Sequence, residues 1–236
     1  TAENVDSERT HLNIDYCNEP IKKVYHEMFD EALKQYNDKQ KRKDRKIPDY
    51  YKHIESGKQE KLFHEIIFQI GNKDDMSATG EHAELARTVL DEYYQGFQER
   101  NPYLRVFSAH LHMDEATPHL HLDYIPVAHG YKKGMKTRNS LTKAFQEMGF
   151  DKAMDKKHTE TMEWQKRERD YIRQLCREKE IFVVRKGEVR DNYSISEYKE
   201  AMRAKESVER ETVEMKEHLE ALTKRMKAYS LEADTL

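Results

Sequence analysis

The sequence contains few of the residues that define several common protein classes. Only two of its 236 residues are cysteines, Cys17 and Cys176, and neither belongs to a C-x-x-C pair. A disulfide scaffold needs more cysteines at closer spacing, so we expect two free thiols in a reducing, cytoplasmic location. Glycine and proline are also scarce, with eight and five residues, and neither occurs after Gly187.

Long apolar runs are absent as well. No stretch of eighteen apolar residues exists, which excludes a membrane-spanning helix, and the first ten residues are too polar for a signal peptide. The net charge of −3 excludes a global basic field of the kind that indicates nucleic-acid binding. Positive charge is nevertheless concentrated in two segments, Lys39–Lys46 and Tyr131–Arg138.

Charged residues are abundant and make up 37% of the chain, against 36% hydrophobic residues. This balance indicates one compact region with long solvated helices outside it. We expect a functional domain over residues 1–195 and a separate C-terminal helix over residues 196–236. Apolar residues recur along that helix at steps of three and four: Met215, Leu219, Leu222, Met226 and Tyr229. This stripe is typical of a coiled coil or of a helix that packs on a partner, and the alternative is packing on the chain's own core.

Hydrophobic periodicity predicts an α+β domain, with an antiparallel sheet covered by helices and a protruding C-terminal helix. The expected strands, which alternate or are rich in β-branched and aromatic residues, are 11–16, 62–70, 103–112, 119–127 and 181–185. The expected helices are 20–42, 47–57, 81–100, 140–148, 155–179 and one long helix from 196.

The residues that indicate chemistry are concentrated in Ala109–Pro126, AHLHMDEATPHLHLDYIP. Side chains alternate along a strand, so His119 and His121 share one face and lie about 6.5–7 Å apart. The short MDEATP connection is expected to fold this strand and the preceding one, which ends at His112, into an antiparallel hairpin. Cross-strand neighbours then lie about 4.5–5.5 Å apart. Three imidazoles at this spacing can bind one divalent metal ion at about 2.0–2.1 Å.

A site of three histidines leaves coordination positions open for water or substrate, which favours catalysis or phosphate binding over a structural role. Asp114, Glu115 and Asp123 are candidates to orient the rings, and Glu115 can also reach the ion or activate a water. His110 remains open between a fourth ligand, a supporting base and a mere neighbour. Mn²⁺ or Mg²⁺ suits phosphoryl transfer, and nitrogen ligands also suit Zn²⁺. The alternative is a histidine-rich surface hairpin without metal.

Three segments resemble the Mob/Pre family of plasmid mobilisation relaxases, also called plasmid recombination enzymes, which are HUH endonucleases. Arg9–Tyr16, RTHLNIDY, is similar to the family's N-terminal R-x-H-L-N-Y motif. Glu65–Asp75, EIIFQIGNKDD, is similar to its first long strand. His112–Val127, HMDEATPHLHLDYIPV, closely matches its H-x-D-E-x-T-P-H-x-H signature. These segments span most of residues 9–127, whereas residues after about 150 match only loosely.

The resemblance implies a metal-dependent single-strand DNA endonuclease and strand transferase. Such an enzyme nicks one strand at a plasmid or mobile-element transfer origin for conjugative mobilisation and keeps the 5′ phosphate covalently on the protein. The metal ligands that it implies are His112, His119 and His121. It also implies that Glu115 assists catalysis and that Arg9, His11 and Asn13 lie beside the site as DNA contacts. Hydrogen bonding within a strand and turn is the alternative role of His11 and Asn13.

The nucleophile in this family, a histidine or tyrosine, is expected before the R-x-H-L-N motif. The eight residues before Arg9, TAENVDSE, contain neither residue type, so we expect the nucleophile upstream of Thr1. Tyr16 is the internal catalytic candidate, because a tyrosine hydroxyl can attack phosphorus, and Tyr50 and Tyr51 are others. A position in the core or on an edge strand is the alternative role of Tyr16.

Relaxases hold single-stranded DNA, and basic grooves with aromatic side chains provide such binding. The DNA contacts that we expect beside Tyr131 are Lys132, Lys133, Lys136 and Arg138. A second candidate is the basic cluster 41–45 with Tyr50 and Tyr51. Two other functions stay open: a non-catalytic, metal-stabilised single-stranded DNA-binding module of replication or recombination, and a metal hydrolase with another substrate. The C-terminal helix predicts a homodimer or a partner protein.

Overall fold

The computed structural model describes residues 5–151, 155, 158–183 and 195–233. The chain divides into two units, residues 1–184 and 185–236. In its described part the second unit is a single helix, α7 (Ile195–Ala233), as the absence of glycine and proline predicts. The described part contains no helix long and apolar enough to cross a membrane. That residue 195 ends the functional domain stays a prediction.

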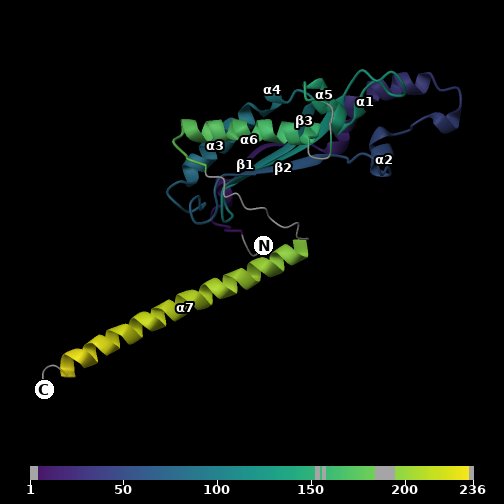
Figure 1. The fold of residues 1–236 in the computed structure, drawn as a ribbon. Helices are drawn as coiled ribbons and strands as arrows, with labels where there is room; N and C mark the ends of the chain where they lie inside the picture. The colour runs from purple at the N-terminus through teal and green to yellow at the C-terminus, as the bar shows by residue number, and fades with distance from the viewer. Residues whose placement is uncertain (1–4, 152–154, 156–157, 184–194, 234–236) are drawn as a thin grey trace. The chain divides into compact units, whose positions relative to one another are not determined.

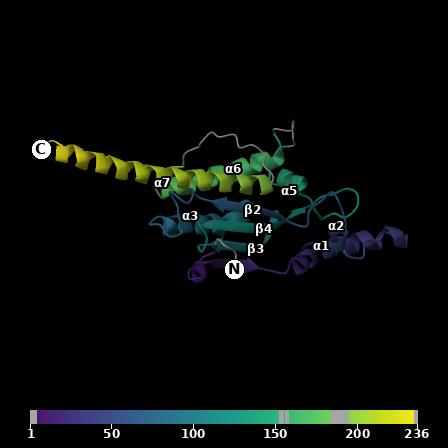
Figure 2. The ribbon, with the colours of Figure 1, turned by 90° about the horizontal axis from the view of Figure 1, so that it is seen from below.

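The first unit is built on an antiparallel sheet, which confirms the predicted α+β class. Its strands are β1 (Ile14–Asn18), β2 (His64–Gln69), β3 (Leu104–His112), β4 (His119–Ala128) and β5 (Arg138–Asn139). Four of them form the order β1-β3-β4-β2, and β5 pairs with the end of β4. Figure 2 shows β2, β4 and β3 side by side. The central pair β3–β4 is the predicted hairpin, and it contains all four histidines of the 109–126 segment.

Helices pack on both faces of this sheet. The first group lies over one face and comprises α3 (Ala83–Gln95), α4 (Phe97–Arg100), α5 (Leu141–Glu147) and α6 (Glu160–Glu178). The second group comprises α1 (Ile21–Asp38) and α2 (Tyr50–Glu55), which lie at one end of the sheet in Figure 1. Two short 3₁₀ turns complete the described elements, η1 (Thr10–Leu12) and η2 (Lys43–Arg45).

The larger core lies between the sheet and the first group of helices. Leu111, Leu120 and Leu122 point into it and are fully buried, each stabilising the fold by about 1.5–3 kcal/mol. Trp164 of α6 stacks on Phe145 of α5 with ring centroids 4.8 Å apart. The alternate residues of β3 and β4 therefore face away from this core, and they include the histidines.

A smaller core covers the other face of the sheet near the C-terminal end of β4. Ile125 and Val127 pack there against α1 and α2, together with Phe107 of β3. The β3–β4 register shifts between Val106 and Ser108, which is a β-bulge. Because of this bulge, Phe107 and Ser108 follow one another without the usual change of face. The second core therefore covers one half of this face, and the histidines occupy the other half.

Several predicted boundaries were wrong for local reasons. Residues 10–12 form a 3₁₀ turn, so the first strand covers 14–18 and not 11–16. The helix predicted over 81–100 is interrupted at Gly96, which separates α3 from α4. Residues 181–183 of the strand predicted over 181–185 are not in a strand, and the rest of that segment lies outside the described residues.

His64 on β2 gives the fold a pH-dependent contribution to stability. Its ring stacks on Tyr124, and burial, with the charge of Lys61, lowers the pKa of His64 below its ordinary 6.5. Below pH 6.5 the unfolded state therefore binds more protons at this residue, and stability falls as the pH is lowered through that window. Urea unfolding from about pH 8 to pH 5 should show a smaller loss for His64→Phe than for the wild type. The exposed His218→Phe should keep the wild-type loss, and equal losses in all three proteins would contradict this assignment.

Candidate metal centre

Three histidine rings meet where the two central strands, β3 and β4, join in their hairpin, on the face that the larger core does not cover. His112 and His119 are direct cross-strand partners, and His121 pairs with His110. The ring centroids are 5.2 Å apart for His112 and His119, 5.3 Å for His112 and His121, and 5.0 Å for His119 and His121. The structure therefore brings together the three residues that strand alternation predicts, and we call them the histidine cluster.

One ring nitrogen of each cluster histidine faces an oxygen atom. His121 Nδ1 lies 2.7 Å from Glu65 Oε1, and His119 Nδ1 lies 2.8 Å from the carbonyl oxygen of Thr117. His112 Nδ1 lies 3.6 Å from Asp114 Oδ1. Histidines that bind metals usually have this arrangement, because an oxygen on one nitrogen fixes the tautomer and leaves the other nitrogen for the ion. In all three residues the nitrogen left over is Nε2.

The cluster fits one metal ion in its distances but not in its ring orientations. Two ring centroids on one tetrahedral ion are about 5 Å apart when the metal–nitrogen bonds are about 2.1 Å. The rings of His112 and His119, however, are nearly parallel, with 22° between their planes. In the described part of the chain, no group of three His, Cys, Asp or Glu side chains is placed so that it could hold a metal ion.

The electrostatics at His112 favour its neutral imidazole, which is the form that binds metals. Burial lowers the pKa of His112 below its ordinary value, and the neighbouring His119 and His121 lower it further. Burial alone would raise the pKa of Asp114, but hydrogen bonds from Asn13 and Thr10 outweigh this effect and leave it below its ordinary value. A buried carboxylate therefore faces the His112 ring.

Two further predicted residues lie at the edge of the cluster. Glu115 Oε2 is 3.8 Å from His119 Nε2, the nitrogen that the Thr117 carbonyl leaves over. Asp123 pairs with Ser108 and Glu65 in the sheet and shares the face of His121, and burial raises the pKa of its carboxyl. Glu115 therefore lies beside His119, and Asp123 lies two residues from His121 on the same face of β4.

The N-terminal motif lies against the hairpin through backbone contacts. Asn13 Oδ1 accepts a 2.7 Å hydrogen bond from the Met113 backbone N–H, and Arg9 donates to the carbonyl oxygens of Met113 and Ala78. His11 is exposed, and its Nδ1 lies 2.8 Å from the Glu8 carbonyl. Asn13 and Arg9 therefore attach the first segment to the connection between β3 and β4. Their role as DNA contacts stays a prediction.

Tyr16 lies apart from the histidine cluster. It follows Asp15 in a bulge of β1, packs against the larger core and donates a 2.7 Å hydrogen bond to Asp91 Oδ1 of α3. Burial and the Asp91 carboxylate raise the pKa of Tyr16 well above its ordinary value, which makes its hydroxyl a poorer nucleophile. The structure therefore favours the core alternative for this residue. Tyr50 and Tyr51 are buried in the smaller core.

Replacing Tyr16 tests this placement. Tyr16→Phe keeps the ring, which stacks on Tyr94 at 4.0 Å, and removes only the hydroxyl. We expect unchanged Mn²⁺ affinity by calorimetry and an unfolding free energy lower by about 1 kcal/mol, the typical contribution of one hydrogen bond. Tyr94→Phe removes a hydroxyl from the same stack and is the control. A loss of metal affinity in Tyr16→Phe alone would place Tyr16 in the metal site.

The predicted basic DNA contacts lie far from the cluster along β4. Arg138 is in β5, which pairs with Val127 and Ala128, and its guanidinium lies 4.2 Å above the Tyr131 ring. The three predicted lysines of this loop are exposed: Lys132, Lys133 and Lys136. In the second basic segment, Arg42 pairs with Asp44 at 2.6 Å. Neither basic segment joins the histidine cluster.

Two contacts of the site were missed at the sequence level. Glu65 reaches His121 because β2 pairs with β4, and Asp15 Oδ1 lies 2.6 Å from His110 Nδ1 because β1 pairs with β3. Strand alternation in 64–69 places Glu65, Ile67 and Gln69 on one face. Strand alternation does not predict which strand pairs with this one, so the contact between Glu65 and His121 could not be predicted from it.

The fold and this cluster define an α+β protein whose antiparallel sheet bears a candidate metal centre. A family model described as plasmid recombination enzyme (Mob/Pre) matches residues 1–200, and the chain belongs to this family. A curated plasmid recombination enzyme from a Bacillus species is 27% identical over 181 residues, which cover 70% of this chain and 39% of that relative. The chain therefore spans about two fifths of the length of this relative.

Solved structures of one relaxase domain resemble the chain more distantly. The MobM relaxase domain bound to plasmid oriT DNA, in a Mn-bound crystal structure at pH 5.5, is 18% identical with a TM-score of 0.48. The match covers 85% of this chain and 86% of that one. A second crystal structure of the same domain, at pH 6.8, is 19% identical with a TM-score of 0.45, over 86% and 85% of the two chains.

Proposed function

We propose that this chain is the DNA-nicking domain of a plasmid mobilisation relaxase. One observation carries the proposal: three histidine rings lie about equally far apart, and each holds one nitrogen against an oxygen atom. That arrangement leaves three Nε2 atoms for one divalent ion with open coordination positions. Membership of the plasmid recombination enzyme family supports a DNA strand as the substrate.

The chain's residues divide into ligands and groups that orient them. His112, His119 and His121 hold the ion, which we propose to be Mn²⁺ or Mg²⁺, with Zn²⁺ as the alternative. Glu65 and the Thr117 carbonyl orient the rings of His121 and His119, and Asp114 lies 3.6 Å from the His112 ring. A bound divalent ion polarises the scissile phosphate and stabilises the charge that develops on it. Glu115, beside His119, is placed to take up a proton during the reaction.

The proposed reaction is a transesterification at one phosphodiester. The nucleophile forms a bond to phosphorus, the bond from phosphorus to the 3′ oxygen breaks, and the 5′ phosphate stays on the protein. Its leaving group becomes a 3′ hydroxyl after it gains a proton. We propose that the nucleophile is a histidine or tyrosine N-terminal to Arg9 and not Tyr16, because the Tyr16 hydroxyl is held by Asp91.

A nicking assay tests this function. The protein, produced from its full gene, is incubated with supercoiled plasmid that carries its own transfer origin and with Mn²⁺. We expect an open-circular product and a protein adduct on the labelled 5′ end, both prevented by EDTA. Binding of origin DNA without any nick or adduct would favour the alternative, a non-catalytic single-stranded DNA-binding module of replication or recombination.

Two further parts of the proposal concern the chain's surroundings. We propose a cytoplasmic location, because two free cysteines suit a reducing compartment.

We also propose that α7 binds a second copy or a partner protein, because Val208, Met215, Leu219 and Leu222 are exposed along it. Sedimentation of the chain with and without residues 196–236 distinguishes a homodimer from a monomer.

A further inference from the structure

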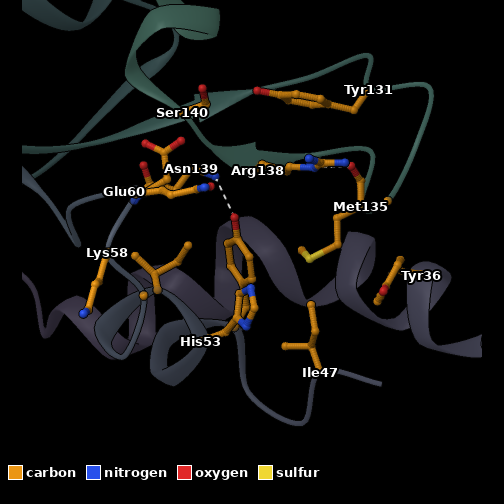
Figure 3. Close-up of a pocket in the computed structure, with 15 residues that line it drawn as sticks. Tyr36, Ile47, His53, Lys58, Glu60, Tyr131, Met135, Arg138, Asn139 and Ser140 are labelled. Atoms are coloured by element: carbon orange, nitrogen blue, oxygen red, sulfur yellow. Dashed lines mark hydrogen bonds between the residues drawn. The ribbon is translucent and has the colours of Figure 1, made fainter. Parts of the chain in front are cut away.

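A second site lies away from the histidine cluster, where α1 and α2 meet the loop before β5. The cavity there has a volume of about 580 Å³ and is shown in Figure 3. This volume is within the range of small-molecule sites, which is about 300–1,000 Å³. Its polar and aromatic lining comes from three separate segments and includes Tyr36, His53, Lys58, Glu60, Tyr131 and Arg138.

The lining combines aromatic rings with cations. Arg138 stacks on the Tyr131 ring at 4.2 Å, and His53 stacks on Tyr50 with ring centroids 6.1 Å apart. Figure 3 shows Tyr131 and Arg138 on one side of the cavity and Lys58 on the other. Proteins that hold single-stranded DNA use this combination, because bases stack on aromatic rings while cations attract the phosphates.

Glu60 adds a selective group to this lining. It is the single carboxylate among the residues that line the cavity, and it forms no hydrogen bond or ion pair with the residues that the structure describes. An ionised carboxylate only accepts hydrogen bonds. Guanine offers it two adjacent N–H donors, from the ring nitrogen and the exocyclic amino group. Thymine offers one N–H between two carbonyl oxygens, and the partial negative charges of these oxygens repel a carboxylate.

The cavity lies within reach of a DNA strand at the histidine cluster. β5, which contributes Arg138 and Asn139 to the cavity, pairs with Val127 and Ala128 of β4. Val127 is six residues from His121 on the same strand, about 20 Å at about 3.4 Å per residue. A single strand of a few nucleotides spans this distance.

From this geometry we infer that the cavity holds one unstacked guanine of the single-stranded DNA whose phosphate is processed at the histidine cluster, and that Glu60 selects it. The inference rests on the proposed function, which supplies the DNA strand. It adds a site for reading one base, separate from the residues that hold the metal ion.

Binding of short oligonucleotides to the whole chain tests this inference. Fluorescently labelled oligothymidine of about twelve nucleotides is compared with the same oligonucleotide in which one central thymidine is replaced by deoxyguanosine. Both carry the same charge, so phosphate attraction cancels in the comparison. In about 100 mM salt with EDTA, we expect the guanine-containing strand to bind about tenfold more tightly by anisotropy.

Three variants distinguish base reading from charge. Glu60→Gln should reduce the guanine preference to about twofold or less. Glu31→Gln removes the same charge from exposed α1 outside the cavity and should leave the preference unchanged. Lys58→Ala should weaken binding of both strands equally. Circular dichroism verifies that each variant is folded.

Each outcome separates this inference from the proposed function. Equal binding of the two oligonucleotides by the wild type would overturn the inference and leave DNA binding intact. A guanine preference that persists in Glu60→Gln would overturn the role of Glu60. No binding of either oligonucleotide, together with no nicking of origin plasmid, would overturn the proposed function itself.

Discussion

Replacing His119 and His121 with alanine together should abolish metal binding and, with it, nicking of the origin plasmid. The two residues supply two of the three Nε2 atoms, and their rings lie 5.0 Å apart on one strand. A single remaining imidazole, His112, cannot hold a divalent ion at neutral pH. Loss of even one group that orients a ligand typically costs about 10–100-fold in metal affinity, so we expect a loss of more than about 100-fold here.

Elemental analysis of the purified proteins and calorimetry with Mn²⁺ provide the measurement. The matched control is the double variant His26→Ala and His218→Ala, which removes the same number of exposed imidazoles from outside the histidine cluster. It should bind metal as the wild type does. Wild-type occupancy in the His119 and His121 variant would show that the metal site lies elsewhere.

The histidine cluster was predictable because it depends on local geometry. Alternation along a strand is a property of the backbone, so His119 and His121 must share a face wherever the strand lies. The short connection from His112 to His119 then makes β3 and β4 neighbours and fixes their register. Neither step needs a contact between residues that are distant in the sequence.

The partners of the cluster were not predictable in the same way. Glu65 and His121 are 56 residues apart, and only the pairing of β2 with β4 brings them together. Tyr16 shows a second limit. Strand alternation from Ile14 predicts that Tyr16 faces the core and that Cys17 faces away from it. Cys17 also packs against that core, because the strand has a bulge between Asp15 and Cys17. A bulge of this kind has no reliable local signal in the sequence.

The helix predicted over 155–179 contains a buried glutamate, Glu168, whose burial could not be predicted from the composition of the helix. Trp164, Glu168 and Leu175 follow helical spacing on the buried side of α6, so a glutamate occupies a position where the stripe predicts an apolar residue. The Glu168 side chain is 1% exposed. It accepts a 2.5 Å hydrogen bond from the Tyr93 hydroxyl, and Arg167 lies 2.8 Å away.

Glu168→Gln should therefore destabilise the first unit strongly. The buried carboxylate also lies 3.3 Å from Arg100, whose guanidinium stacks 3.7 Å from the Tyr171 ring. Removing one partner of a buried ion pair costs about 3–5 kcal/mol, because the remaining charge loses its compensation. Both arginines keep some exposure to solvent, which reduces the expected loss to about 2–3 kcal/mol. For a chain of this size the melting temperature should fall by about 5–10 °C.

Thermal unfolding followed by circular dichroism measures this loss, with Glu163→Gln on the exposed side of the same helix as the control. Glu163 differs from Glu168 in exposure and not in helix or residue type, so the control should stay within about 0.5 kcal/mol of the wild type. Metal affinity at the histidine cluster should be unchanged in both folded variants, because α6 packs on the opposite face of the sheet. Equal stability of the two variants would mean that solvent already compensates Arg100 and Arg167, and that the charge of Glu168 contributes little to holding α6 against α3.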